Sequence, residues 1–242
     1  MTFLQGKWAF VTGASRGVGA HLANGLAQLG CNLVLHSRDL SHTADLAARL
    51  RATGVSVVAV AAELADPAQI DPLLDSVQAA AQIDILYNNA AIQVAKQRAI
   101  WQTSPQDLRR SLEVNLVSLI RICDRLAPPM VARGWGRIIN LTSGIADQPE
   151  QTAYAVSKAG VDKYVRDFAP HLRGTGVQMT LLDPGWLRTD LGGPHAPGDP
   201  ASVLPGALVP ALMERDENGR FFQAQEYAGL TLDAALHKAL TP

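Results

Sequence analysis

A tyrosine and a lysine stand four residues apart in the stretch TAYAVSKAG, residues 152–160, and together they could move a proton. In a helix, Tyr154 and Lys158 would lie one turn apart on the same face. A free tyrosine has a pKa of about 10, and an ammonium about 4 Å away stabilises its phenolate by about 4 kcal/mol at an effective dielectric near 20. The spacing therefore predicts a general acid–base pair in which the lysine lowers the pKa of the tyrosine.

The helix that carries this pair should turn it toward the protein interior. Apolar residues follow at helical spacing, and stepping back along their face reaches Lys158 and then Tyr154; these residues are Val161, Val165, Phe168 and Leu172. A purely structural pair on a surface helix is the alternative interpretation. An unpartnered lysine on an inward face is costly, which favours a chemical role.

A glycine-rich turn near the N-terminus could bind a pyrophosphate. The segment TGASRGVG, residues 12–19, follows an apolar, strand-like run and leads into a helical pattern. Gly13, Gly17 and Gly19 would let the backbone approach phosphates closely, and the helix N-terminus favours an anion. Because both flanking patterns are those of a dinucleotide site, the turn predicts one.

The composition excludes several other classes of protein. The chain has 242 residues, of which 48% are hydrophobic and 18% charged, with a formal net charge of −1. We find no basic stripe, no apolar run long enough for a membrane span, no secretory signal and no cluster with metal-ligand spacing. Cys31 and Cys123 lie in apolar runs and should be free buried thiols. We expect a cytoplasmic protein with no metal and no nucleic-acid or membrane partner.

Short apolar runs alternate with longer helical patterns along the chain. Strands are expected over 8–12, 32–36, 55–60, 83–87, 137–142, 177–182 and, more weakly, 220–223. Helices are expected over 17–29, 41–53, 67–81, 104–127 and 153–173. This alternation is typical of a parallel sheet covered on both faces. It predicts an α/β fold, a single doubly wound Rossmann-type domain over 1–242 with about seven strands. The Pro- and Gly-rich segment 190–215 is either a substrate lid or an irregular surface connection.

These motifs together resemble the short-chain dehydrogenase/reductase family. The resemblance covers almost the whole chain and rests on the TGxxxGxG turn, NNAA at 88–91, Asn115, Ser143, the YxxxK pair and DPGWLRT at 183–189. It implies a catalytic set of Asn115, Ser143, Tyr154 and Lys158. In the family, the serine polarises the substrate oxygen, the tyrosine protonates it, and the lysine also holds the nicotinamide ribose. The asparagine holds a water that relays protons.

Two members of this set have alternatives. Asn115 falls on an apolar stripe of its helix, so its amide needs buried partners, and a structural asparagine capping a bend competes with the catalytic role. Ser143 ends the fifth strand, eleven residues before Tyr154, and this loop is shorter than is usual in the family. Thr142 is the alternative hydroxyl.

The resemblance also implies the cofactor and substrate contacts. Residues at the adenine and phosphate end would be Gly13, Ser15, Arg16, Gly17, Val18, Gly19, Ser37, Arg38, Glu63, Leu64, Asn89 and Ala90. Residues at the nicotinamide end would be Tyr154, Lys158, Pro184, Gly185, Leu187 and Thr189. The substrate would lie against Gln93, Gly144, Ile145 and Trp186. The chain departs from the family pattern at Ala91, usually glycine, and at Glu63, commonly aspartate.

The end of the second strand predicts NADPH rather than NADH. Ser37 stands where an acidic residue usually accepts hydrogen bonds from the adenosine ribose, and Arg38 follows it with donors suited to a 2′-phosphate. Asp39 would favour NADH if the strand ended one or two residues later.

The function expected is that of an NADPH-dependent carbonyl (aldehyde or ketone) reductase or alcohol dehydrogenase acting on a small substrate. The alternative is a non-catalytic dinucleotide-binding regulator or sensor on the same fold. Because the family often associates through helices equivalent to 104–127 and 153–173, a homodimer or homotetramer is possible.

Overall fold

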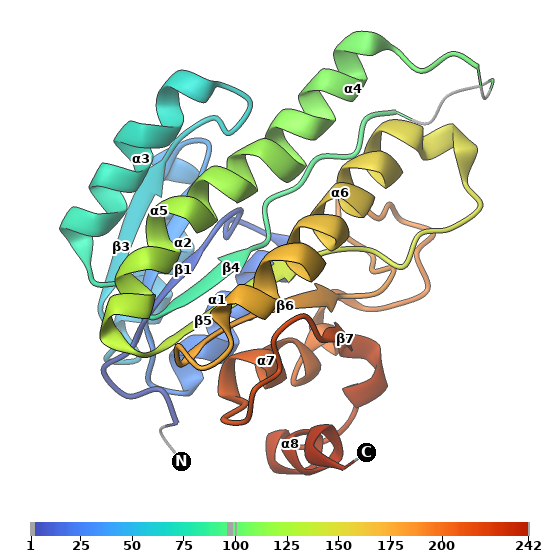
Figure 1. The fold of residues 1–242 in the computed structure, drawn as a ribbon. Coiled ribbons are helices and arrows are strands. Elements are labelled where there is room, and N and C mark those ends of the chain that lie inside the picture. Colours follow the sequence, from blue (N-terminus) through green and yellow to red (C-terminus); the bar gives the residue numbers. More distant parts are fainter. Residues whose placement is uncertain (1–2, 96–98, 100, 242) are drawn as a thin grey trace.

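Seven parallel strands form one sheet through the middle of the molecule (Figure 1). The computed structural model describes residues 3–95, 99 and 101–241. The strand order is β3-β2-β1-β4-β5-β6-β7. The strands are β1 Trp8–Val11, β2 Asn32–Ser37, β3 Val57–Ala61, β4 Ile85–Asn88, β5 Gly136–Leu141, β6 Val177–Asp183 and β7 Phe221–Gln223. The predicted Rossmann-type α/β sheet of about seven strands is confirmed.

Helices cover both faces of this sheet. They are α1 Gly17–Gln28, α2 Ala44–Arg51, α3 Pro67–Ala80, α4 Pro105–Leu112, α5 Ser118–Arg133, α6 Thr152–Phe168, α7 Val209–Leu212 and α8 Leu232–Leu240. Successive side chains of a strand point to opposite faces. Ala9 and Val11 accordingly join one buried cluster, with α1, α2, α7 and α8. Phe10 joins the other, with α3, α5 and α6.

The strand order reverses at β1, which pairs with β2 on one side and β4 on the other. In open parallel sheets a crevice forms at such a reversal, beyond the carboxyl ends of the strands, and ligands bind there. The glycine turn follows β1 and the NNAA segment follows β4, so both lie at this crevice.

The helix predicted over 104–127 is interrupted and longer than expected. α4 passes through a π-helical turn, Glu113–Val117, into α5, which continues through Pro128 and Pro129 to Arg133. Gly134, with φ of 71°, ends it in the left-handed conformation that glycine favours. The expected end at residue 127 was therefore wrong. α6 is shorter than expected and ends at Phe168, with a 3-10 turn over Ala169–Leu172.

The segment 190–215 divides into an outer and an inner part. Val203, Ala207 and Val209 are fully buried, and the Tyr87 hydroxyl donates to the Ala207 carbonyl at 2.7 Å. A Cβ on Gly25 of α1 would lie 2.9 Å from Leu208. Residues 203–213 thus belong to the packed core. The predicted lid stays a prediction, and we place it in the outer part, 190–202.

Two further observations bear on function. Within the described part of the chain, no helix combines the length and apolarity that a bilayer crossing requires, and no three His, Cys, Asp or Glu side chains gather as metal ligands. Cys31 and Cys123 are buried free thiols, as predicted.

Candidate active site

The glycine turn has the backbone shape that a close phosphate approach requires. Gly13 and Gly17 have φ of 64° and 54°, which favours glycine. A Cβ on Gly19 would lie 2.2 Å from the Gly13 carbonyl oxygen. Ser15, Arg16 and Val18 complete the turn and the start of α1, to which Gly17 and Gly19 also belong.

The NNAA segment holds this turn from the inside. The Thr12 hydroxyl oxygen accepts the backbone N–H groups of Asn89 and Ala90 at 3.0 and 2.9 Å. The Asn89 side-chain amide donates to the carbonyls of Thr12 and Gly13 at 2.8 and 3.1 Å. Asn89 therefore holds the glycine turn, and its predicted place at the adenine end of the cofactor stays a prediction.

The end of β2 supports NADPH over NADH, because Asp39 does not take the position at the strand end that would favour NADH. β2 ends at Ser37, whose hydroxyl donates to the Asp39 carbonyl at 2.6 Å, and Arg38 is exposed. The Asp39 carboxylate accepts the backbone N–H and hydroxyl of Ser41 at 2.8 and 2.6 Å, and these bonds lower the pKa of that carboxyl. Because Asp39 caps its own turn, it is not directed at a cofactor ribose.

Arg16 and Glu63 have local partners. Arg16 pairs with Asp190 at 3.0 Å, with both side chains mostly exposed, so the pair joins the glycine turn to the start of the predicted lid. The Glu63 carboxylate accepts the N–H of Ala65 at 2.9 Å. Leu64 is buried, and its carbonyl accepts the Ser118 hydroxyl at 2.7 Å.

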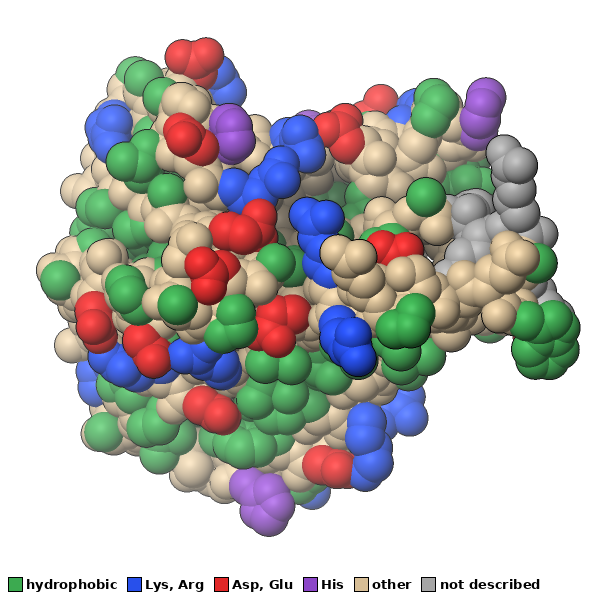
Figure 2. All heavy atoms as spheres, turned by 90° about the horizontal axis from the view of Figure 1, so that it is seen from above, with side chains coloured by type: hydrophobic (Ala, Val, Ile, Leu, Met, Phe, Trp, Pro, Cys, Tyr) green, Lys and Arg blue, Asp and Glu red, His purple; other side chains and the backbone are tan. Residues whose placement is uncertain are grey.

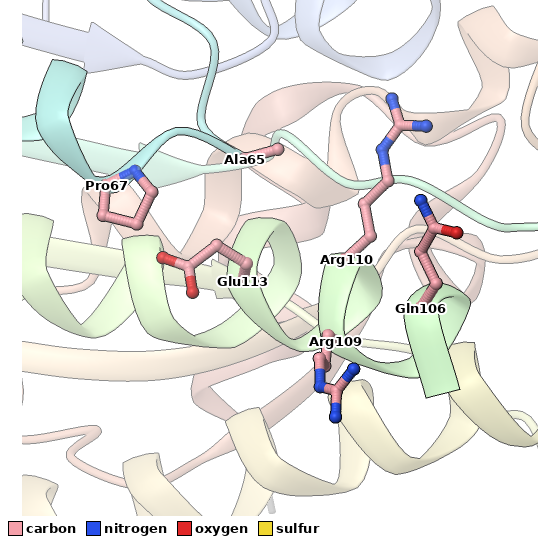
Figure 3. A pocket seen from close by; sticks show the side chains of 6 residues that line it. All are labelled: Ala65, Pro67, Gln106, Arg109, Arg110 and Glu113. Atoms are coloured by element: carbon pink, nitrogen blue, oxygen red, sulfur yellow. The ribbon is translucent and has the colours of Figure 1, made fainter. Parts of the chain in front are cut away.

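A pocket of about 370 Å³ adjoins the Glu63–Leu64 segment. It lies between the start of α3 and α4 and is lined by Ala65, Pro67, Gln106, Arg109, Arg110 and Glu113. Figure 3 shows Arg110 reaching across toward the neighbouring loops while Arg109 points away from them. None of the predicted catalytic residues lines the pocket. Because it adjoins Glu63 and Leu64, it borders the expected adenine end of the cofactor site.

The catalytic pair lies on the inward face of α6. Tyr154 is 8% exposed and Lys158 3%, as the apolar pattern predicts. The Lys158 ammonium donates to the Leu141 carbonyl at 2.7 Å and lies 5.8 Å from the centre of the Tyr154 ring. The Thr142 hydroxyl donates to the Asp162 carboxylate. The Thr142 hydroxyl is thus engaged, which favours Ser143 as the predicted substrate-binding hydroxyl.

Burial displaces the pKa values of both groups. It raises the pKa of Tyr154 to about 12, and the Asp183 charge adds to this, while a hydrogen bond with Ser143 acts in the opposite direction. Burial lowers the pKa of Lys158 to about 8, against the charges of Asp162 and Asp183. The expectation that Lys158 lowers the pKa of Tyr154 was wrong for the cofactor-free protein. The loss of hydration outweighs an ammonium that is directed at Leu141.

Asn115 lies in the π-helical turn, and its side-chain amide makes three hydrogen bonds. Its oxygen accepts the N–H of Ile92 at 2.8 Å, and its nitrogen donates to the Ile92 carbonyl and to the Ser157 hydroxyl, each at 2.9 Å. Ser157 in turn donates to the Tyr154 carbonyl at 2.7 Å. These contacts support the structural interpretation at a bend, in which Asn115 ties the segment after β4 to α6. Its water-holding role stays a prediction.

The loop after β6 meets the glycine turn. Gly185 has φ of 86°, and the Pro184 carbonyl accepts the Gln225 amide at 2.8 Å. Leu187 is buried. A Cβ on Gly17 would lie 3.1 Å from the Thr189 methyl group, so the predicted phosphate and nicotinamide segments are brought together.

The predicted substrate residues lie around the same crevice. Gly144 and Ile145 directly follow Ser143, and the Ile145 N–H donates to the Ser143 hydroxyl at 3.3 Å. The Gln93 amide donates to Gln151, which precedes α6. Trp186 is 62% exposed, and its indole N–H donates to the Gly192 carbonyl at 2.8 Å. Figure 2, seen from above, shows side chains of both charges bordering a hollow in the molecule.

Sequence reasoning interpreted His36 as structural and gave no role to Gln225 or Asp183, although all three lie at this site. His36 contacts the glycine turn, Gln225 contacts Pro184, and Asp183 contacts Gly144 and Gly185. Asp183 stood inside the DPGWLRT motif, and His36 interrupts an otherwise apolar strand. Gln225 had no signal, because its position depends on how β7 pairs with β6.

A family model decides the identity. The model of the short chain dehydrogenases matches residues 7–199. The chain belongs to the short-chain dehydrogenase family. A short-chain type dehydrogenase/reductase of Picea abies is 34% identical over 199 residues, which are 78% of this chain and 73% of that protein.

Other relatives of this short-chain dehydrogenase carry more specific names. An NADPH-dependent aldehyde reductase-like protein of Arabidopsis thaliana chloroplasts is 33% identical over 202 residues, 78% of this chain and 75% of that protein. The crystal structure of a 3-oxoacyl (acyl-carrier-protein) reductase from Agrobacterium tumefaciens C58 with NADP bound matches with a TM-score of 0.75 and 32% identity. That match covers 97% of this chain and 88% of that one.

Proposed function

We propose that this short-chain dehydrogenase is an NADPH-dependent reductase of small aldehydes or ketones. The observation that carries the proposal is the buried Tyr154, which lies near the Ser143 hydroxyl and one helical turn from the buried Lys158. In carbonyl reduction Tyr154 would be the proton donor, a role suited to a buried phenol that carries its proton. The NADPH-dependent aldehyde reductase-like relative and the NADP-bound reductase structure support the reductive direction.

The residues present fit the cofactor. A Cβ on Gly19 would collide with the Gly13 carbonyl oxygen and the Asn89 amide, so only glycine lets the turn fold tightly onto the start of α1, where the N–H groups favour an anion. Arg38 would hold the 2′-phosphate. Ser37 has no charge to repel that phosphate, and the Asp39 carboxylate is bonded to Ser41. Lys158 would hold the nicotinamide ribose. When bound, NADPH supplies the hydride that reduces the carbonyl carbon.

The protein side of the reaction follows from three residues. The Ser143 and Tyr154 hydroxyls would both donate to the carbonyl oxygen as negative charge develops on it. Tyr154 would then transfer its proton to that oxygen. The Lys158 ammonium would stabilise the phenolate left behind, because opposite charges attract strongly in a buried site.

Initial rates of NADPH oxidation with a panel of aldehydes, ketones and diketones test the proposal. We expect turnover of at least one class. NADPH binding, seen by fluorescence, with no turnover on any carbonyl would overturn the reductase and favour the sensor. The homodimer or homotetramer and the cytoplasmic location stay predictions.

A further inference from the structure

One carboxylate joins the two loops that meet at the reacting centre. Asp183 is the last residue of β6. Its Oδ2 accepts the backbone N–H of Gly144 at 3.1 Å, and its Oδ1 accepts the backbone N–H of Gly185 at 2.9 Å. Gly144 follows Ser143, and Gly185 lies in the loop expected to seat the nicotinamide. Asp183 therefore sets the spacing between the catalytic serine loop and that loop.

The two loops are built around this carboxylate. β5 and β6 are neighbours in register, with Leu141 beside Leu182, so both loops leave the sheet at the same level. A Cβ on Gly144 would lie 2.9 Å from the Asp183 oxygen, so only glycine allows this approach without a shift. Hydrogen bonds to an ionised acceptor are stronger than neutral ones.

The charge of Asp183 also acts on the catalytic pair. The charged groups that act on Tyr154 and Lys158 come from two elements, Asp162 on α6 and Asp183 on β6. Asp162 acts on Lys158 and accepts the Thr142 hydroxyl. Burial is the larger cause of both pKa shifts. The Asp183 charge also acts on both groups and disfavours the loss of a proton from each.

We propose that Asp183 is a positioning residue: its carboxylate holds the Ser143 loop against the nicotinamide loop through the backbone N–H groups of Gly144 and Gly185. The inference rests on the proposed reductase function. It assigns a role to a residue that makes no contact with the reacting atoms itself.

Two variants test this role. Asp183→Asn keeps the size of the side chain but removes the charge and turns an NH₂ group toward one of the two N–H donors. It should lower kcat at least tenfold, and because the negative charge is gone the alkaline limb of the kcat profile should move to lower pH. Asp183→Glu keeps the charge but adds a methylene, so it should lower kcat and leave the limb in place.

Asp167→Asn is the matched control. Asp167 lies on α6 like the catalytic pair, but it is exposed and paired with Lys163, so this variant should keep the wild-type kcat and profile. An inactive wild type would refute the reductase itself. If the wild type is active, an unchanged kcat in Asp183→Asn overturns the inference. A lower kcat in this variant with an unmoved alkaline limb also overturns it. If Asp183→Asn fails to fold, a kcat of Asp183→Glu equal to that of the wild type overturns the loop-holding role.

Discussion

Tyr154 and Lys158 are displaced in opposite directions by one cause, because burial favours the neutral form of each. The phenol is neutral when protonated, and its pKa rises to about 12. The amine is neutral when deprotonated, and its pKa falls to about 8. Near pH 7 both groups therefore carry their protons, the phenol as a donor and the ammonium as a nearby positive charge.

Arg38 is the residue that should select the cofactor. Paired charge-assisted contacts to a 2′-phosphate contribute about 1.5–3 kcal/mol each, and even one of them corresponds to about tenfold. Wild type should therefore prefer NADPH by at least tenfold in kcat/KM, and Arg38→Ala should lose that preference while use of NADH changes little.

Arg173→Ala is the control for this experiment, since Arg173 is also an exposed arginine but lies just before β6, at the edge of the sheet opposite to the glycine turn. Equal use of both cofactors by the wild type, or an unaltered preference in Arg38→Ala, would refute the role of Arg38.

At the scale of elements, the strands were predictable because short apolar runs bounded by polar turns have few alternatives. The helices were less so. Pro128 and Pro129 indicated a stop, yet α5 continues to Arg133, since tertiary packing overrides local propensity. α8 was missed, although Thr231 caps it by accepting the Ala234 N–H at 3.2 Å. Its burial of Ala235 and Ala239 against the core is a tertiary contact.

The predicted lid at 190–202 should change its protection when cofactor binds. Arg16 and Asp190 already join this segment to the glycine turn, and lids exclude water on closing. Hydrogen exchange should be slower over 190–202 in the presence of NADPH. The buried residues 203–213 provide an internal reference that should change little. Equal exchange of 190–202 in both states would leave this segment a surface connection.

At the scale of the whole molecule, the site is assembled from segments distant in the sequence. The gathering of the glycine turn, NNAA, Ser143 and DPGWLRT was predictable, because parallel strands end at one edge of the sheet. The high pKa of Tyr154 was not, because it depends on how deeply α6 is buried. Nor was the bridge from Asp183 to Gly144, which depends on the register of β5 and β6.

His36 should make the stability of the whole molecule depend on pH. Its Nδ1 accepts the Gly13 N–H at 3.2 Å and its Nε2 donates to the Ala62 carbonyl at 3.1 Å, so the ring is neutral. Burial lowers its pKa from 6.5 to about 4. Between these values the unfolded chain binds the proton and the folded one does not. The contribution of His36 to the free energy of unfolding is therefore fully present above pH 6.5 and is lost as the pH drops toward 4.

Urea unfolding at pH 7 and pH 5 measures this effect. Wild type should lose about 2 kcal/mol more than His36→Gln between the two pH values. His21→Gln is the control, as His21 lies on the partly exposed face of α1. An equal loss in wild type and His36→Gln would show that His36 is not the group responsible.

The most direct test of the account is the turnover of Tyr154→Phe, with NADPH affinity measured on the same protein by fluorescence titration. The substitution removes only the hydroxyl oxygen, so the fold and the cofactor site should persist. We expect kcat for carbonyl reduction to fall by about 10²–10⁴ and the Kd for NADPH to stay within a few fold. A near-normal kcat in Tyr154→Phe would contradict the assignment of Tyr154 as the proton donor.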